Sequence, residues 1–259
     1  MSGYILCQTK KAERPYFIEN ISTNIYSIEE LCYYLYHNLY LIDASVINEE
    51  LCMWIQQELE LPKLAAKLRP KLQNYTNAED VLYPIFKEIN YLTYEELKNL
   101  NSRMALLNQE SPALRQKRKG DCLVENRMYV NAIQVYQKLL EQNPDSERTD
   151  FAADVLYNLG CAYSYLFQME KALECFWVSY EKSQSQTTLK TYLLAYRNTR
   201  NKKDYEHRVS ELKITEELKK KLKEAWKEFE KIPEKPVEGR ESGAMLEDLM
   251  KDYHRTTGS

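Results

Sequence analysis

The chain has 259 residues, of which 44% are hydrophobic, and a formal net charge of −3 at pH 7. This composition excludes a globally disordered protein, and the near-neutral charge gives no overall attraction to nucleic acid or to an anionic membrane. No apolar run approaches the roughly 18 residues of a membrane span, and the N-terminus lacks the basic region and apolar core of a secretion signal, so we expect a cytoplasmic protein.

Glycine and cysteine placement narrows the class of fold. Between residues 4 and 238 only Gly120 and Gly160 occur, although sheet-rich folds and phosphate-binding loops need many turn glycines. The six cysteines are scattered without a CxxC pair, which is typical of small buried residues and not of a disulfide framework or a metal site. We therefore expect an all-α protein that needs no cofactor and no metal.

Residues 1–112 are predicted to form a mostly helical domain. Residues 4–7 and 15–21 could form two short extended segments around a turn. Helices then start at two capping-box patterns, in which Ser27 precedes Glu30 and Thr93 precedes Glu96.

Further caps and prolines divide this domain. Asn48 and Asn77 are expected to open two more helices. Pro70 is expected to break or kink a basic helix, and Pro84 to bend the helix after Asn77. Ser111 followed by proline marks a break, which places a domain boundary after residue 112.

Residues 113–232 are predicted to form repeats closed by a capping helix. The first copy has Gly120, Ala132 and Tyr136, and the second has Gly160, Ala172 and Phe176. Equal internal offsets at one period are typical of stacked helical hairpins. The small residues allow two helices to approach closely, and the aromatic residues fill the space beside that contact.

The C-terminal part follows the repeats. Thr215 is expected to start a long amphipathic helix that covers the last repeat. Residues 233–243 are predicted to be a flexible linker. The final segment would place five apolar side chains on one helical face: Met245, Leu246, Leu249, Met250 and Tyr253. This tail could be a frayed terminus. Alternatively, we hypothesise that it docks on a groove of its own body or of a partner, which includes self-association.

The repeat region resembles the tetratricopeptide repeat superfamily. Its second copy carries the family pattern at Leu159, Gly160, Tyr163, Ala172 and Phe176, the first copy is weaker, and a third unit over 193–209 is degenerate. The resemblance implies a superhelix of helical hairpins that binds a peptide or a helix on its concave face. The groove residues that it implies are Lys117, Asp121, Val124, Glu125, Asp154, Tyr157, Asn158, Cys161 and Tyr165.

One subgroup of this family clamps the C-terminal carboxylate of heat-shock proteins with lysine and asparagine side chains. Lys117 and Asn158 match that pattern, but Asp121 stands where the first asparagine should be. Because a carboxylate there would repel the carboxylate of the ligand, the clamp is disfavoured.

We therefore predict a non-enzymatic adaptor that binds a protein or peptide. An enzyme, or a regulatory subunit with a site in the N-terminal domain, stays open as an alternative, although Cys32 and His37 lie on poorly aligned faces of one helix. Nucleic-acid binding also stays open. It would use two basic patches, at Arg115, Lys117, Arg118 and Lys119 and at Lys63, Lys67, Arg69 and Lys71.

Overall fold

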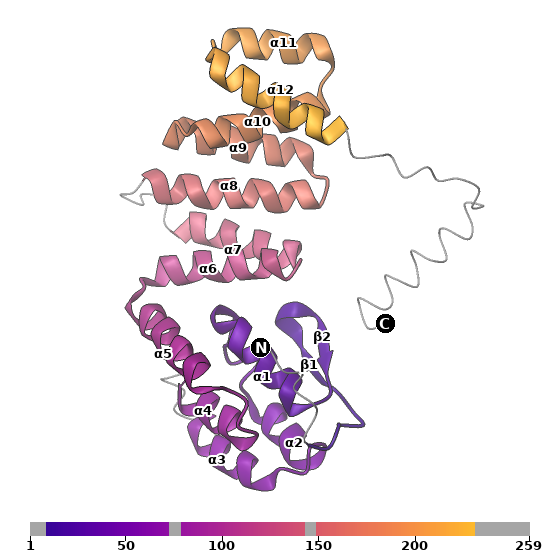
Figure 1. Cartoon of the computed structure of the whole chain (residues 1–259), viewed down its shortest axis with the longest axis vertical. Helices are drawn as coiled ribbons and strands as arrows, with labels where there is room; N and C mark the ends of the chain where they lie inside the picture. Colours follow the sequence, from indigo (N-terminus) through magenta and orange to yellow (C-terminus); the bar gives the residue numbers. More distant parts are fainter. Residues whose placement is uncertain (1–8, 73–78, 143–148, 231–259) are drawn as a thin grey trace, which may run out of the picture. The chain divides into compact units, whose positions relative to one another are not determined.

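The computed structural model describes residues 9–72, 79–142 and 149–230, most of which are helical (Figure 1). The predicted all-α fold of helical hairpins is confirmed. The chain divides into two compact units, with the division between Arg127 and Met128. The domain boundary predicted after residue 112 stays a prediction. In the described ranges no helix is both long and apolar enough to span a membrane.

The first unit begins with a short antiparallel hairpin. Strand β1 (Tyr16–Ile18) pairs with β2 (Thr23–Ile25), and the 3-10 turn η1 (Glu19–Ile21) joins them. The Tyr16 hydroxyl donates a hydrogen bond of 2.9 Å to the Val46 carbonyl, which fixes the hairpin to the body of the unit. The extended segment predicted over 15–21 is thus a strand only at 16–18, and the segment predicted at 4–7 lies outside the described residues.

Six helices follow in the described residues of the first unit. They are α1 (Ile28–His37), α2 (Glu49–Gln57), α3 (Pro62–Leu72), α4 (Glu79–Glu88), α5 (Tyr94–Gln109) and α6 (Pro112–Glu125), with the 3-10 turn η2 (Leu39–Leu41) after α1. Their shared core is aliphatic and includes Leu31, Leu35, Ile55, Leu64, Leu68 and Ile85.

The predicted helix starts of this unit are confirmed where they are described. The Thr93 hydroxyl and the Glu96 carboxylate form a complete capping box, and the Asn48 side chain accepts from the Leu51 amide. The Ser27 hydroxyl caps α1 by accepting from the Glu30 amide, but the Glu30 carboxylate accepts from the amide of Tyr26 and not from that of Ser27.

The two prolines predicted to disturb helices, Pro70 and Pro84, both lie inside helices. α3 continues through Pro70 to Leu72, so the chain is not broken there, and Pro84 lies within α4. Pro70 removes one backbone hydrogen bond from the last turn of α3, because proline has no N–H to donate. The cap predicted at Asn77 lies outside the described residues.

The second unit is a stack of helices (Figure 1). In chain order they are α7 (Tyr129–Gln142), α8 (Thr149–Tyr165), α9 (Met169–Ser183), α10 (Gln186–Thr199), α11 (Lys202–Glu211) and α12 (Glu216–Glu230). Consecutive helices from α7 to α11 pack on each other, and α12 packs on α10.

Small residues allow α8 and α9 to pack closely, as predicted. Ala172 on α9 is fully buried, and the ring of Phe176 lies directly against Gly160 on α8. The Ser179 hydroxyl on α9 donates to the Ala153 carbonyl on α8 at 2.7 Å, which further links the two helices.

α12 caps the stack as the sequence predicts. The Thr215 hydroxyl accepts from the Leu218 amide at 3.2 Å and starts the helix. Leu218 and Leu222 are buried, while the three lysines between them are exposed. α12 therefore covers the apolar face that α10 would otherwise leave in water.

Candidate functional site

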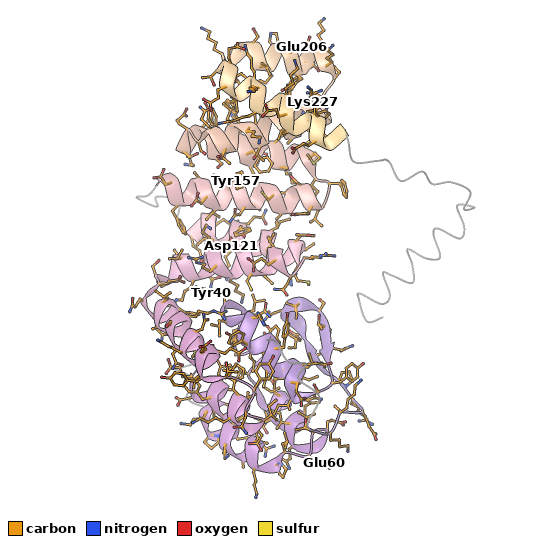
Figure 2. All side chains as sticks on the ribbon, viewed as in Figure 1. Tyr40, Glu60, Asp121, Tyr157, Glu206 and Lys227 are labelled. Atoms are coloured by element: carbon orange, nitrogen blue, oxygen red, sulfur yellow. The ribbon has the colours of Figure 1, made fainter. Side chains whose placement is uncertain are left out.

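The residues predicted to line the groove lie on two helices that belong to different units. Lys117 and Asp121 lie on α6 in the first unit, with Val124 and Glu125 one turn further along. Asp154, Tyr157, Asn158, Cys161 and Tyr165 lie on α8 in the second unit. Figure 2 labels one residue of each set, Asp121 and Tyr157.

On α6 the two predicted residues bind each other. The Lys117 ammonium lies 3.0 Å from the Asp121 carboxylate one turn away, and the side chains are only 17% and 26% exposed. The positive charge of Lys117 is therefore already compensated by a carboxylate of the same helix. This pairing adds to the argument against a clamp for a terminal carboxylate, because a ligand would have to compete with Asp121.

On α8 one stripe stays open to solvent while the opposite face is buried. The open stripe runs through Asp154, Asn158, Cys161 and Tyr165, at helical spacings of three and four residues. The buried face comprises Ala153, Val155, Leu159, Gly160, Ala162 and Tyr163. Asn158 and Cys161 are half-buried, whereas Asp154 and Tyr165 are exposed. The assignment of these residues to a binding groove stays a prediction.

Tyr157 connects this stripe to the next hairpin. Its hydroxyl shares a hydrogen bond of 3.2 Å with the hydroxyl of Thr191 on α10, and its ring packs on Phe176 with the ring centroids 5.6 Å apart. Burial raises the pKa of the neighbouring Cys161 thiol, although a hydrogen bond with Tyr157 partly opposes that rise. Cys161 is thus kept as a neutral thiol, which does not suit a nucleophile.

Tyr165 is the largest exposed side chain of the stripe, and a neighbouring ring covers one face of it. Its side chain is 59% exposed, yet its ring stacks on Tyr129 of α7 with centroids 4.5 Å apart and planes 8° apart. Two residues later Phe167 is 87% exposed in a left-handed conformation, with φ of 56°. Tyr129 was not predicted from the sequence, because stacking between α7 and α8 leaves no local sequence pattern. Phe167 was not predicted either, because its left-handed turn position usually favours glycine.

The basic patches of the nucleic-acid alternative are largely neutralised by carboxylates. On α6, Lys117 pairs with Asp121, Arg118 with Glu110 and Lys119 with Asp43. On α3, Arg69 pairs with Glu49 and Lys71 with Asp80. Because most of these charges have acidic partners, the patches do not present the concentrated positive field that phosphate binding needs.

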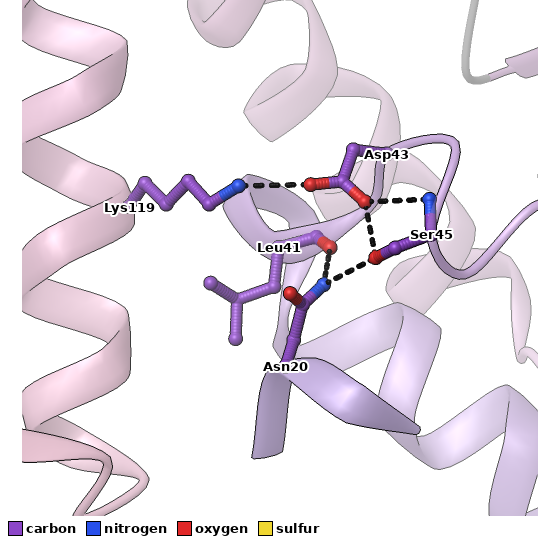
Figure 3. A network of polar contacts seen from close by, with 5 residues as sticks. All are labelled: Asn20, Leu41, Asp43, Ser45 and Lys119. Atoms are coloured by element: carbon purple, nitrogen blue, oxygen red, sulfur yellow. Dashed lines mark hydrogen bonds and ion pairs between the residues drawn. The ribbon is translucent and has the colours of Figure 1, made fainter. Parts of the chain in front are cut away.

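A hollow of about 300 Å³ in the first unit lies beside the ion pair of Asp43 and Lys119. The Lys119 ammonium lies 2.8 Å from the carboxylate, which also accepts from the amide and hydroxyl of Ser45 (Figure 3). Burial raises the pKa of Asp43, but the hydrogen bonds from Lys119 and Ser45 outweigh it, so the pKa is lowered overall. A carboxylate with all these donors is a structural anchor and a poor general base.

The remaining candidates for enzymatic chemistry also have structural partners. His37 lies between the rings of Tyr33 and Tyr36, with centroids 4.3 and 5.1 Å away. Burial raises the pKa of the Cys32 thiol, so it stays protonated. Within 9–72, 79–142 and 149–230, no three His, Cys, Asp or Glu side chains gather as a metal site would require.

The apolar residues predicted for the tail lie outside the described residues, which end at Glu230. Docking of Met245, Leu246, Leu249, Met250 and Tyr253 therefore stays a prediction.

Comparisons with known proteins bear on the second unit and on α6. A family model described as tetratricopeptide repeat matches residues 118–146, and a second with the same description matches residues 153–176. A solved structure titled "MamA RS-1 ArsTM double mutant" is similar at 16% sequence identity, with a TM-score of 0.36, over 72% of this chain and 96% of that chain. The search of curated proteins gave no match.

Proposed function

Because the central part of this chain belongs to the tetratricopeptide repeat superfamily, whose members are protein–protein interaction modules, we propose that it is a cytoplasmic, non-enzymatic adaptor. It binds a peptide or a helix of a partner protein on the open stripe of α8. The stripe is defined by Asp154, Asn158, Cys161 and Tyr165.

The observation that carries the proposal is the stacked pair of Tyr129 and Tyr165. An exposed aromatic ring that is already immobilised loses little conformational entropy when a partner covers it. Tyrosine is also enriched at the residues that dominate interface energies. Since the 4.5 Å stack holds Tyr165 in place while 59% of its surface stays exposed, this ring fits an anchor for a partner.

The polar residues of the stripe would orient the bound segment. Asn158 can both donate and accept hydrogen bonds, as the backbone of a peptide requires, and Asp154 places a negative charge at the other end of the stripe. An amphipathic or extended segment with an apolar residue toward Tyr165 and a basic residue toward Asp154 matches this arrangement.

The test is a quantitative affinity pull-down with the native chain and with an Asn158→Ala, Tyr165→Ala double variant. A matched control replaces the exposed Glu181 and Lys182 of α9 by alanine, away from the stripe. We expect partners to be lost from the double variant and kept by the control, at unchanged helicity and melting temperature. Equal recovery of partners by all three proteins would contradict the assignment of the stripe.

A further inference from the structure

A second surface of the same unit forms a groove of about 440 Å³ between α9, α10 and α11. We refer to it as the aromatic groove. Its lining includes Leu173, Trp177, Tyr192, Tyr196, Arg200 and Arg208. None of these residues belongs to the open stripe of α8.

The floor of the aromatic groove is a continuous set of rings. The centroid of Tyr192 lies 5.2 Å from that of Trp177 and 5.6 Å from that of Tyr196. The Arg208 guanidinium covers the Trp177 ring at 4.3 Å and donates to the Tyr192 hydroxyl. Such a floor offers apolar contact area to a ligand, and the arginine fixes the positions of the rings.

The rim of the aromatic groove is suited to carboxylates. Arg200 holds the Glu170 carboxylate through two hydrogen bonds of 2.6 Å, while the Glu170 side chain remains 70% exposed. Because exposed ion pairs contribute little, another carboxylate can replace Glu170 at small cost. Lys171 and Arg208 add two more positive charges around the groove, against one further carboxylate, Glu174. Arg208 also pairs with Glu211 at 3.2 Å, so the lining retains a small positive excess.

Residues 244–254 of this chain have the complementary pattern. In helical spacing they place Met245, Leu246, Leu249, Met250 and Tyr253 on one face. The same segment carries Glu247, Asp248 and Asp252 against one lysine, so it is acidic. An apolar face with acidic flanks matches a floor of aromatic rings with a basic rim.

The start of this tail lies near the groove. The Arg197 guanidinium on α10 lies 3.9 Å from the centroid of Trp226 on α12. Arg197 is three residues before Arg200 in the chain, and Trp226 is four residues before the end of α12. With a rise of about 1.5 Å per residue and about 10 Å between packed helices, Glu230 lies on the order of 20 Å from the rim.

The intervening residues 231–243 can span this distance. Thirteen residues reach at most about 45 Å when extended, and their root-mean-square length as a flexible chain is about 20 Å. A tether whose length matches the span gives an effective concentration in the millimolar range. A tail of the same chain is thereby favoured over one from a second molecule.

We propose that residues 244–254 dock as a short helix in the aromatic groove of their own chain. Their apolar face covers Trp177 and Tyr196, and their carboxylates replace Glu170 at Arg200. Because the groove is separate from the open stripe of α8, the two proposals stand or fall independently.

A photo-crosslink in the full-length chain tests the position of the tail. Benzoylphenylalanine replaces Leu249, and the irradiated protein is analysed by mass spectrometry. We expect an intramolecular crosslink to residues of α9, α10 or α11 in a chain of monomer mass. A crosslink to a second copy, to another part of the chain, or to nothing would overturn the proposal.

Peptide binding tests the chemistry of the groove. The probe is a fluorescein-labelled peptide of residues 242–256, and the readout is its anisotropy. We expect a full-length chain with Leu249→Asp, whose own tail cannot dock, to bind the probe about 10-fold more tightly than the unmodified chain. Equal affinity for the two chains would overturn docking in the same molecule.

A charge reversal at the rim provides the matched comparison. In the Leu249→Asp chain, we expect Arg200→Glu to weaken probe binding at least about 5-fold, which is about 1 kcal/mol. Lys202→Glu makes the same charge change two residues away at an exposed position outside the groove, and we expect no such loss. Equal effects of the two reversals would show nonspecific attraction and overturn the assignment of the rim.

Discussion

The ring of Phe176 occupies the space in which a side chain at Gly160 would begin. A Cβ atom at position 160 would lie 2.7 Å from Cε1 and 2.8 Å from Cδ1 of Phe176. The ring is only 2% exposed and also packs on Tyr157, so it cannot easily move away. Glycine is thus required inside α8 although it weakens a helix by about 1 kcal/mol relative to alanine.

The Gly160→Ala variant is expected to be less stable than the native protein, by up to about 2 kcal/mol. Alanine improves the helix propensity, but the clash with the buried ring costs about 1–3 kcal/mol as overpacking, and the clash prevails. Urea denaturation followed by circular dichroism measures the change. Phe176→Leu should destabilise the Gly160→Ala variant much less than it destabilises the native protein. An increase in stability for Gly160→Ala alone would contradict the close packing.

A buried amide organises the contact between α1 and α6. Asn38 is buried, and its side-chain oxygen accepts from the Asn126 amide at 2.8 Å and from the Cys122 thiol at 3.4 Å. Its side-chain nitrogen donates to the Tyr34 carbonyl at 3.1 Å. Asn38→Ala is expected to destabilise the first unit by about 1–3 kcal/mol, because buried partners lose their hydrogen bonds.

The control for this prediction is Asn101→Ala. Asn101 accepts a hydrogen bond from the Tyr83 hydroxyl at 2.6 Å, but the pair is exposed, so water can replace the lost partner. We expect a loss of only a few tenths of a kcal/mol for the control, as is usual for surface substitutions. Similar losses for both asparagines in chemical denaturation would contradict the role of burial.

The sequence predicted best what short segments determine by themselves. The caps at Ser27, Asn48 and Thr93 and the start of α12 at Thr215 each depend on residues within one turn. The offsets from Gly160 to Phe176 span one hairpin, so the close packing of α8 on α9 also followed from the pattern.

Contacts between residues distant in the chain left no comparable signal. Lys119 pairs with Asp43, and Tyr129 stacks on Tyr165, but nothing near either partner indicates the other. The aromatic groove could not be predicted for the same reason, because Trp177 and Arg208 lie on different hairpins. Basic patches therefore looked free in the sequence although the fold provides acidic partners for them.

His37 makes the stability of the first unit depend on pH. Burial of the ring and the positive charge of Arg103 lower the pKa of His37 below its usual 6.5. The folded state therefore disfavours the protonated ring, so the contribution of His37 to stability is complete above pH 6.5. It is lost as the pH falls through the lowered folded pKa.

We expect the native protein to lose more stability between pH 7 and pH 5 than a His37→Gln variant does. Urea denaturation at several pH values between 5 and 7 measures how steeply the free energy of unfolding changes with pH in each protein. His207→Gln is the control, because it removes an exposed histidine from α11. If native protein and His37→Gln have the same pH slope, His37 is not the origin of the dependence.

Arg197 joins the last three helices of the second unit. Its guanidinium lies 3.9 Å from the Trp226 ring of α12 and 5.6 Å from the Tyr205 ring of α11. Arg197→Met keeps the length and the apolar part of the side chain but removes both cation–π contacts, which we expect to cost about 1 kcal/mol. Because α12 is the terminal helix of the stack, the loss should appear as local opening and not as global unfolding.

Hydrogen exchange measured by mass spectrometry distinguishes these outcomes. In Arg197→Met we expect amides of α12 to exchange about 5-fold faster, with α8 and α9 unchanged, since 1 kcal/mol corresponds to about that factor. Arg200→Met is the control, because Arg200 is the C-cap residue of the same helix but binds Glu170 of α9. Arg197→Lys should retain part of the protection, because an ammonium group is also attracted to the Trp226 ring. Equal exchange in α12 for Arg197→Met and Arg200→Met would mean that the buried Leu218 and Leu222, and not Arg197, hold the capping helix in place.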